Sequence, residues 1–259
     1  MLKLNGVEIT PTIFPDKTSQ IWKVNPALFK FSSYVILWEF ESEGEIMHLA
    51  QLVDLIRKCS TERVPQIVLW MPYLPYARQD KEISNESTFA LRSFAAIIEK
   101  FRFSGITVTD AHSDVVKELF WGMTIQYPMS IMQVAYLDTM SQVTFYPDKG
   151  AMRKYGNRFE KFPFGENYTF GEKVRDPESG QLKSYELDDP ERVKDKNVLI
   201  IDDICDGGGT FILAYKALKE AGAREVNLFT THGLYTAGTE VLFYAGFSRI
   251  FNRKGEVIK

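Results

Sequence analysis

One stretch of the sequence, residues 197–210, most limits what this chain can fold into. It begins with a continuous apolar run, which suits a strand buried on both faces. Asp202 and Asp203 stand at the predicted end of that strand, three consecutive glycines follow at 207–209, and a helical pattern covers 211–221. Such an arrangement can hold a phosphorylated sugar, because carboxylates accept hydrogen bonds from ribose hydroxyls and N–H groups at a loop and helix start bind phosphate.

The three glycines are the most specific part of this stretch. Glycine costs conformational freedom, so a run of three indicates that the backbone must approach something closely. The alternative is a flexible turn without a ligand. The loop has no Gly-Lys-Ser/Thr and no Gly-x-Gly-x-x-Gly spacing, so it is neither a Walker loop nor a dinucleotide fingerprint.

Composition limits the class of protein. With 259 residues, 45% apolar and 25% charged, the chain can form one large domain or two small ones around a sizeable core. A formal net charge of -3 gives no signal for binding nucleic acid. Cys59 and Cys205 have no paired spacing, and we find no signal peptide and no apolar run long enough for a membrane. We therefore expect a cytoplasmic protein without a membrane partner.

The pattern along the chain alternates between strands and helices. Strands are predicted at 34–38, 66–71, 105–110 and 142–146, and helices at 46–60 and 91–101. This alternation predicts an α/β fold built on parallel sheets flanked by helices. The cycle starts again near residue 128, so we expect two similar domains, 1–128 and 129–259.

Polar motifs follow several of the predicted strands, where sites in open α/β sheets lie. Arg78 can fork onto a phosphate and Gln79 can bond a base or ribose. A surface loop with a solvated Arg–Asp pair is an equally good interpretation of that motif alone. Taken singly, His112 is more often structural and Asp148 more often a turn aspartate.

A polar segment covers residues 162–192. Within it, 172–180 has no core pattern and is predicted to be a mobile loop or a hairpin. Long polar segments inside compact domains are often functional. On their own, Lys173 and Arg175 would be solvated charges.

Together these stretches resemble the ribose-phosphate pyrophosphokinase family, also called phosphoribosyl pyrophosphate synthetases, over residues 14–238. The specific motifs are Tyr73-Leu-Pro-Tyr-Ala-Arg-Gln-Asp80, similar to the ATP-binding signature, and Asp202-Asp203 with 206–210, similar to the pyrophosphate and ribose 5-phosphate loops. Shorter matches are Asp110-Ala-His112, Pro147-Asp-Lys-Gly150, Lys173-Val-Arg175 and Thr230-Thr-His-Gly233.

The resemblance implies two domains of the phosphoribosyltransferase type I fold. It also implies transfer of the β,γ-diphosphoryl group of Mg-ATP to the C1 hydroxyl of ribose 5-phosphate, releasing AMP. The ATP-binding residues it implies are Arg78, Gln79, Asp80, His112, Phe14 and Asp16. The ribose phosphate-binding residues it implies are Asp202, Asp203, Asp206, Gly207, Gly208, Gly209 and Thr210. Lys173 and Arg175 would be catalytic, and His112 and Asp148 would serve a Mg²⁺ ion.

The chain departs from the family pattern at both ends. The family's N-terminal Phe-x-Asp-Gly-Glu, which reaches the adenine of a neighbouring subunit, is Phe14-Pro-Asp16-Lys-Thr here. The sequence also stops soon after Phe251-Asn-Arg-Lys, where family members continue. The resemblance implies a homo-oligomer, a dimer or a hexamer, but we do not extend it to ADP inhibition or phosphate activation.

A further departure lies in the glycine loop. The family usually has Asp-Thr-Gly/Ala-Gly-Thr, and Gly207 replaces that threonine. The change removes a hydroxyl that would bond a terminal 5-phosphate, worth about 1.5–3 kcal/mol if nothing replaces it. It also leaves room for an acceptor whose 5-phosphate is substituted, such as ADP-ribose.

Two other classes compete with this interpretation. A type I phosphoribosyltransferase shares the acidic pair and the phosphate loop, but does not need Tyr-Ala-Arg-Gln-Asp or Lys-x-Arg. A non-catalytic synthetase-associated subunit would be expected to have lost catalytic positions. His112, Asp148, Lys173 and Arg175 are all present, which favours an enzyme.

Overall fold

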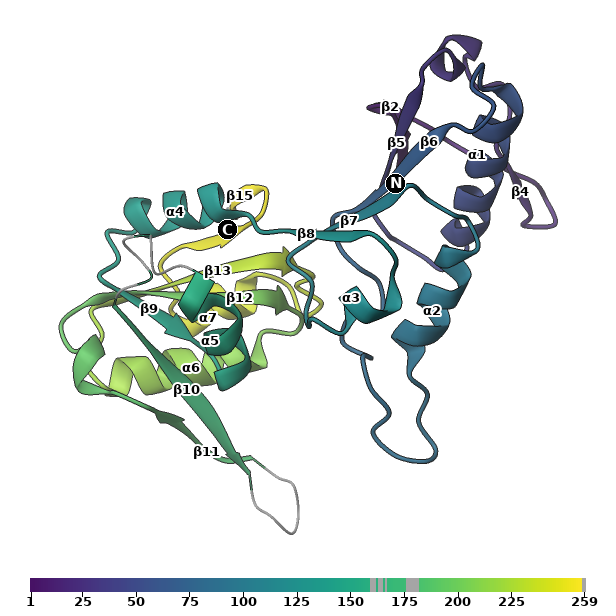
Figure 1. The fold of residues 1–259 in the computed structure, drawn as a ribbon. Coiled ribbons are helices and arrows are strands. Elements are labelled where there is room, and N and C mark those ends of the chain that lie inside the picture. The colour runs from purple at the N-terminus through teal and green to yellow at the C-terminus, as the bar shows by residue number, and fades with distance from the viewer. Residues whose placement is uncertain (159–161, 163–164, 166, 176–181, 258–259) are drawn as a thin grey trace. The chain divides into compact units, whose positions relative to one another are not determined.

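The computed structural model describes residues 1–158, 162, 165, 167–175 and 182–257, without the side chains of residues 157, 175, 182 and 183 (Figure 1). The chain divides into two compact units, Met1–Tyr127 and Pro128–Lys259. The sequence pattern places this division after residue 128. Each unit is built on a mainly parallel sheet with helices packed against it, so the predicted α/β fold class is confirmed.

The first unit contains a sheet in the order β2-β1-β5-β6-β7-β8. Its strands are β1 (Leu2–Leu4), β2 (Val7–Glu8), β5 (Ser33–Trp38), β6 (Gln66–Met71), β7 (Gly105–Thr109) and β8 (Met123–Gln126). Strands β5 to β8 are parallel, while β1 and β2 are antiparallel additions at one edge. The three strands predicted for this part of the chain are present to within one residue at each end.

Helices cover one face of this sheet. They are α1 (Glu45–Cys59), α2 (Ala90–Glu99) and the short α3 (Val116–Leu119). The apolar residues whose spacing predicted α1 form the face that the helix buries. They are Leu49, Leu52, Val53 and Ile56, and all four lie inside the core. A two-stranded hairpin, β3 (Thr12–Ile13) and β4 (Ser19–Gln20), and a 3-10 turn, η1 (Pro26–Phe29), precede β5.

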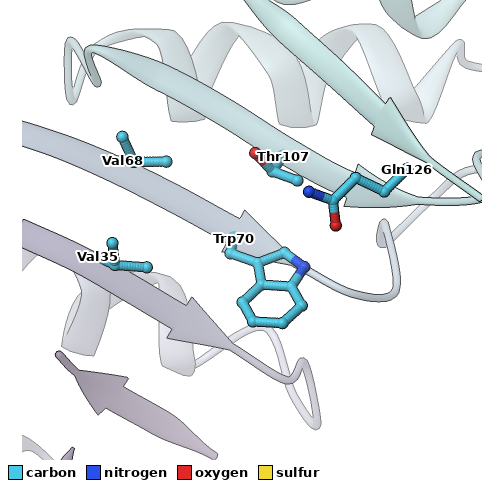
Figure 2. A pocket seen from close by; sticks show the side chains of 5 residues that line it. All are labelled: Val35, Val68, Trp70, Thr107 and Gln126. Atoms are coloured by element: carbon cyan, nitrogen blue, oxygen red, sulfur yellow. The ribbon is translucent and has the colours of Figure 1, made fainter. Parts of the chain in front are cut away.

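The opposite face of the sheet is partly open. Residues along β5 and β6 alternate between buried and accessible, whereas a sheet covered on both faces would bury every position. A hollow of about 210 Å³ lies on this face, lined by Val35, Val68, Trp70, Thr107 and Gln126 (Figure 2). None of the predicted site residues is among these five.

The second unit contains a sheet in the order β11-β10-β9-β12-β13-β14-β15. Its strands are β9 (Val143–Tyr146), β10 (Tyr168–Arg175), β11 (Leu182–Leu187), β12 (Asn197–Cys205), β13 (Glu225–Gly233), β14 (Ile250–Asn252) and β15 (Gly255–Val257). Its helices are α4 (Met129–Asp138), α5 (Lys149–Tyr155), α6 (Gly209–Glu220) and α7 (Glu240–Ala245), with 3-10 turns η2 (Gly156–Arg158) and η3 (Glu191–Val193).

Strand β12 and helix α6 form the centre of this unit. Residues 198–201 are fully buried, which is the two-sided burial that the apolar run predicted. On α6 the buried residues are Phe211, Ala214 and Leu218. Gly222 follows the helix in a left-handed conformation, with φ 89°, as expected of a glycine at a helix end.

No helix in the described ranges is both long enough and apolar enough to cross a membrane.

Candidate active site

The candidate site in the second unit lies at one edge of its sheet. Strands β9, β12 and β13 are neighbouring and parallel, so the segments after them meet at the same edge. Strand β12 is longer than predicted, and Asp202 and Asp203 lie within it instead of at its end. The reason is tertiary: β13 continues alongside and pairs Ile204 with His232 and Cys205 with Gly233.

The two acidic residues have different surroundings, because successive residues of a strand point to opposite faces. Asp203 is only 4% exposed, and its Oδ2 lies 3.2 Å from Nζ of Lys154 on α5. Asp202 is half-buried and accepts a hydrogen bond from the Asp203 backbone N–H at 2.9 Å. Burial, and then the nearby charges of Asp203 and Asp148, raise the pKa of Asp202 well above its ordinary value. A cation or hydroxyl donors beside Asp202 would relieve this cost.

The glycine loop leads from β12 into α6. Gly208 has a left-handed backbone, φ 81°, and a Cβ there would lie 2.9 Å from Cδ2 of Leu242, so this position requires glycine. The other two glycines are not required in that way. A Cβ on Gly209 would meet nothing within 4 Å, and one on Gly207 only Oγ1 of Thr236 at 3.9 Å. The loop is therefore open beside Gly207 and Gly209.

The segment after β13 closes one side of this loop. Thr236 donates a hydrogen bond from its hydroxyl to Oδ1 of Asp206 at 2.7 Å. Its backbone N–H donates to the carbonyl of Asp206 at 3.2 Å. These contacts hold Asp206 at the entrance of the loop.

Strands β10 and β11 form an antiparallel arm that carries Lys173 and Arg175. The Lys173 ammonium donates a hydrogen bond to the Thr210 hydroxyl at 2.5 Å, so the arm reaches the first turn of α6. Glu172, one residue earlier, pairs with Lys149 of α5 at 2.5 Å. The predicted loop or hairpin is a hairpin in its described part. Residues 176–181 and the side chain of Arg175 lie outside that part.

Asp148 caps helix α5. Its Oδ1 accepts a hydrogen bond from the Ala151 N–H at 2.8 Å, and the residue is exposed. Its charge also contributes to the raised pKa of Asp202. Asp148 therefore has the structural role that the sequence suggested for it when taken singly. This capping hydrogen bond uses one carboxylate oxygen and leaves the second available.

These carboxyl groups fit a hydrated magnesium ion. Mg²⁺ is usually held by one or two carboxylates, with waters and substrate phosphates completing its shell. Asp148 and Asp202 are donors of this kind. Across the described residues no three or more His, Cys, Asp or Glu side chains gather as a preformed metal cage. His112 belongs to the first unit.

Two segments for which the family resemblance implies ATP binding, 73–80 and 110–112, follow neighbouring strands at one edge of the first unit's sheet. Strands β6 and β7 are adjacent and parallel, and at their ends the N–H of Thr109, the last residue of β7, donates to the carbonyl of Pro72 at 3.2 Å. The chain then turns through Tyr76, which has φ 61°, to Arg78 and Gln79, both exposed. Asp80 is half-buried.

The other segment at this edge follows β7. Asp110 is buried with φ 49°, and its N–H donates to the carbonyl of Gln126 on β8 at 2.8 Å. His112, two residues later, is exposed. The fold therefore brings the predicted histidine motif and the Tyr73–Asp80 motif to neighbouring strand ends.

Phe14 and Asp16 are not at this edge but in the turn of the β3–β4 hairpin. Hydrogen bonds from the Thr18 hydroxyl and N–H, at 2.7 and 3.0 Å, hold the Asp16 carboxylate and lower its pKa. The hairpin is fastened to α1 by Gln51, which accepts from the Ile21 N–H at 2.7 Å and donates to the Ser19 carbonyl at 2.9 Å. Figure 1 shows β4 beyond α1, on the side away from the sheet.

Sequence reasoning missed Lys154, Tyr185 and Thr236 of the candidate site. Tyr185, on β11, donates a hydrogen bond from its hydroxyl to the carbonyl of Pro147 at 2.7 Å. Burial raises its pKa, and the charges of Asp148 and Asp202 raise it further. For Lys154 and Thr236 the sequence signal was position, because each lies a few residues beyond a recognised strand-end motif.

The fold is of the phosphoribosyltransferase type. Residues 166–258 match the phosphoribosyl transferase domain family. The fold is shared with the phosphoribosylpyrophosphate synthetase from Mycobacterium smegmatis, with a TM-score of 0.79 at 21% sequence identity, over 95% of this chain and 79% of that one.

Relatives identified by sequence show which family of this fold the chain belongs to. The ribose-phosphate pyrophosphokinase of Pyrococcus furiosus is 30% identical over 208 residues, which cover 79% of this chain and 71% of the relative. That of Sulfolobus acidocaldarius is 25% identical over 94% of this chain and 83% of the relative. That of Pyrococcus abyssi is 32% identical over 171 residues, or 58% of its length. The chain belongs to the ribose-phosphate pyrophosphokinase family, which confirms the predicted resemblance and enzyme class.

Proposed function

We propose that this chain transfers the β,γ-diphosphoryl group of Mg-ATP to the C1 hydroxyl of ribose 5-phosphate, giving phosphoribosyl pyrophosphate and AMP. The observation that carries the proposal is the 2.5 Å contact between Lys173 and Thr210. This contact supports the proposal because a cation from the arm lies beside the first turn of α6, and diphosphoryl transfer needs cations that can stabilise negative charge. The product would supply nucleotide and NAD precursor synthesis.

On this proposal each part of the second unit has a definite task. The N–H groups at the start of α6 and the Thr210 hydroxyl bind the 5-phosphate. Asp202 and Asp203 accept hydrogen bonds from the ribose 2- and 3-hydroxyls, and Lys154 keeps Asp203 in place. The sugar is thereby oriented so that its C1 oxygen lies in line with the β-phosphorus of ATP.

The transfer itself needs charge stabilisation more than covalent help from the protein. The C1 oxygen bonds to the β-phosphorus, and the bond from that phosphorus to the bridging oxygen breaks with its electron pair left on the oxygen of AMP. The proton of the C1 hydroxyl is released to water. Lys173 and Arg175 stabilise the charge on the transferring group. In the first unit His112 would contact the Mg²⁺-bound triphosphate, and in the second unit Asp148 would support a metal ion through waters. Arg78, Gln79 and Asp80 would bind ATP, with Phe14 and Asp16 contributed by a neighbouring subunit.

A direct assay tests the proposal. Purified protein is incubated with Mg-ATP, with and without ribose 5-phosphate, and AMP and the pyrophosphorylated sugar are measured. The proposal requires acceptor-dependent AMP release. Formation of nucleotide from phosphoribosyl pyrophosphate and a free base would instead indicate a phosphoribosyltransferase, and absence of any turnover would favour a non-catalytic subunit.

One observation favours a second candidate acceptor. A Cβ on Gly207 would meet only Oγ1 of Thr236, at 3.9 Å, so the loop has room beside the 5-phosphate. We propose as the alternative function the same transfer onto a 5-substituted ribose phosphate such as ADP-ribose. A panel of 5-phosphorylated acceptors decides between the two: efficient turnover of ribose 5-phosphate with none of ADP-ribose rejects the alternative.

We also propose that the chain acts as a homo-oligomer, a dimer or a hexamer. The support is family membership, and the turn that carries Phe14 and Asp16 is held outside the strand-end site of its own unit. Analytical ultracentrifugation across a concentration series tests this, and a monomer at every concentration would contradict it.

A further inference from the structure

Tyr185 lies where the arm joins the rest of the second unit. In the antiparallel ladder it stands directly opposite Lys173, so the two side chains extend from the same face of the arm. Strand β11 is the edge strand of the sheet and pairs with β10. The Tyr185 hydroxyl adds a link beyond that ladder, because it donates to the carbonyl of Pro147 at 2.7 Å.

Pro147 gives this link its importance. It lies between β9 and Asp148, so the bond ties β11 to the turn that carries the predicted metal aspartate. The tyrosine ring is half-buried and packs on the second unit's core. A ring has few rotatable bonds, whereas the long stem of Lys173 has many, so Tyr185 is the better-defined anchor.

Gly171 makes room for this anchor. A Cβ at Gly171 would lie 2.5 Å from the Tyr185 hydroxyl oxygen and 2.6 Å from the adjoining ring carbons. Gly171 has no positive φ to explain its identity. The absence of its side chain is what allows the ring to cross β10 and reach Pro147.

We infer that Tyr185 is a positioning residue, which fixes the base of the arm against Pro147 and so sets where the Lys173 ammonium meets Thr210. Tyr185 acts through Lys173 and need not touch the substrate. Its effect on turnover rests on the proposed function, but its effect on the arm does not. Losing the hydroxyl therefore loosens β10 and β11 whether or not the chain transfers a diphosphoryl group.

The test begins with Tyr185→Phe, which removes only the hydroxyl. In the ligand-free protein, amide hydrogen exchange over 168–175 and 182–187 becomes faster, while the melting temperature stays within the range of the control Tyr244→Phe. Tyr244 is a suitable control because it is 87% exposed on α7 of the same unit. In turnover, kcat falls about 10- to 100-fold, the cost of a misplaced catalytic group, with less than a twofold change in the acceptor KM.

A second variant disrupts the same Tyr185–Pro147 hydrogen bond from the neighbouring strand β10. Gly171→Ala displaces the ring and produces the same kcat loss and faster exchange in the wild-type background. Combined with Tyr185→Ala, it adds nothing, because the ring it would displace is already gone. A further loss in the double variant would overturn the inference.

Two other results would also overturn it. One is a Tyr185→Phe protein with unchanged kcat and unchanged exchange in the arm. The other is a parallel change in kcat, KM and melting temperature, which would indicate general destabilisation. If the wild-type chain shows no diphosphoryl transfer at all, the proposed function fails, and the exchange measurements still decide the role of Tyr185.

Discussion

The ion pair between Lys154 and Asp203 allows a stability prediction worked directly from the structure. The side chains are 15% and 6% exposed, and their charged atoms are 3.2 Å apart. In Lys154→Met the aspartate would remain buried without this cation. Breaking a buried pair by removing one partner costs about 3–5 kcal/mol, most of which is the penalty of the remaining charge. We expect the unfolding free energy of the second unit to fall by that amount at pH 7.

Two further variants separate charge from shape. Lys154→Arg keeps the cation and should recover most of the loss. The double variant Lys154→Met with Asp203→Asn removes the buried negative charge that Lys154→Met leaves without this cation, so it should be more stable than Lys154→Met alone. The matched control is Lys117→Met, whose partner Asp114 lies 2.5 Å away but whose pair is 53% and 74% exposed. Exposed pairs are worth about 0.2–1 kcal/mol.

Urea unfolding can assign the loss to the correct unit. All four tryptophans, at positions 22, 38, 70 and 121, lie in Met1–Tyr127, so tryptophan fluorescence reports that unit alone. Far-UV circular dichroism reports both units. The circular dichroism transition should shift to lower urea by more than the fluorescence transition. A loss below about 1 kcal/mol, or a double variant no more stable than the single one, would refute the reasoning.

Three further predictions concern the site. Lys173→Ala should lower kcat about 10²- to 10³-fold in the AMP-release assay, against Lys117→Ala as control, because it removes charge stabilisation of the transferring group; an unchanged kcat contradicts this role. Because the native Asp202 carboxyl keeps its proton at pH values where the unfolded chain has lost it, stability without Mg²⁺ should decline as pH rises from about 4 through the raised pKa. In urea titrations, Asp202→Asn should flatten the decline of stability with pH. An unchanged dependence of stability on pH would show that another group causes the decline. Gly207→Thr should keep turnover of ribose 5-phosphate but reduce that of any 5-substituted acceptor, measured as the ratio of their kcat/KM values; an unchanged ratio would show that the room beside Gly207 is not used.

The fold was largely readable from local patterns. The apolar run at 198–201 predicted a strand buried on both faces, and the spacing of Leu49, Leu52, Val53 and Ile56 predicted the buried face of α1. These signals depend on burial periodicity within a few residues, which the chain carries in its own order. The weaker strands β14 and β15 were missed because they are three residues each and are formed by pairing at the sheet edge.

The chemistry of the candidate site was readable only in part. The sequence placed Asp202 and Asp203 beside the glycine loop, but did not distinguish their surroundings. The structure separates them: Asp203 is paired with Lys154, and Asp202 is left half-buried with a raised pKa. A difference of this kind depends on which helix packs on which face of the strand, and no local pattern contains it.

By itself, then, the sequence determined the α/β class, the strand-to-helix order and the residue types at the strand ends, because each depends on neighbours along the chain. Only the tertiary structure decided that Gly208 alone among the three glycines is required by the backbone. It also decided that Lys173 meets Thr210, 37 residues away, and that Tyr185 fastens the arm to Pro147, 38 residues away. Those contacts join elements distant in the chain, and they exist only once the sheet has brought its strands side by side.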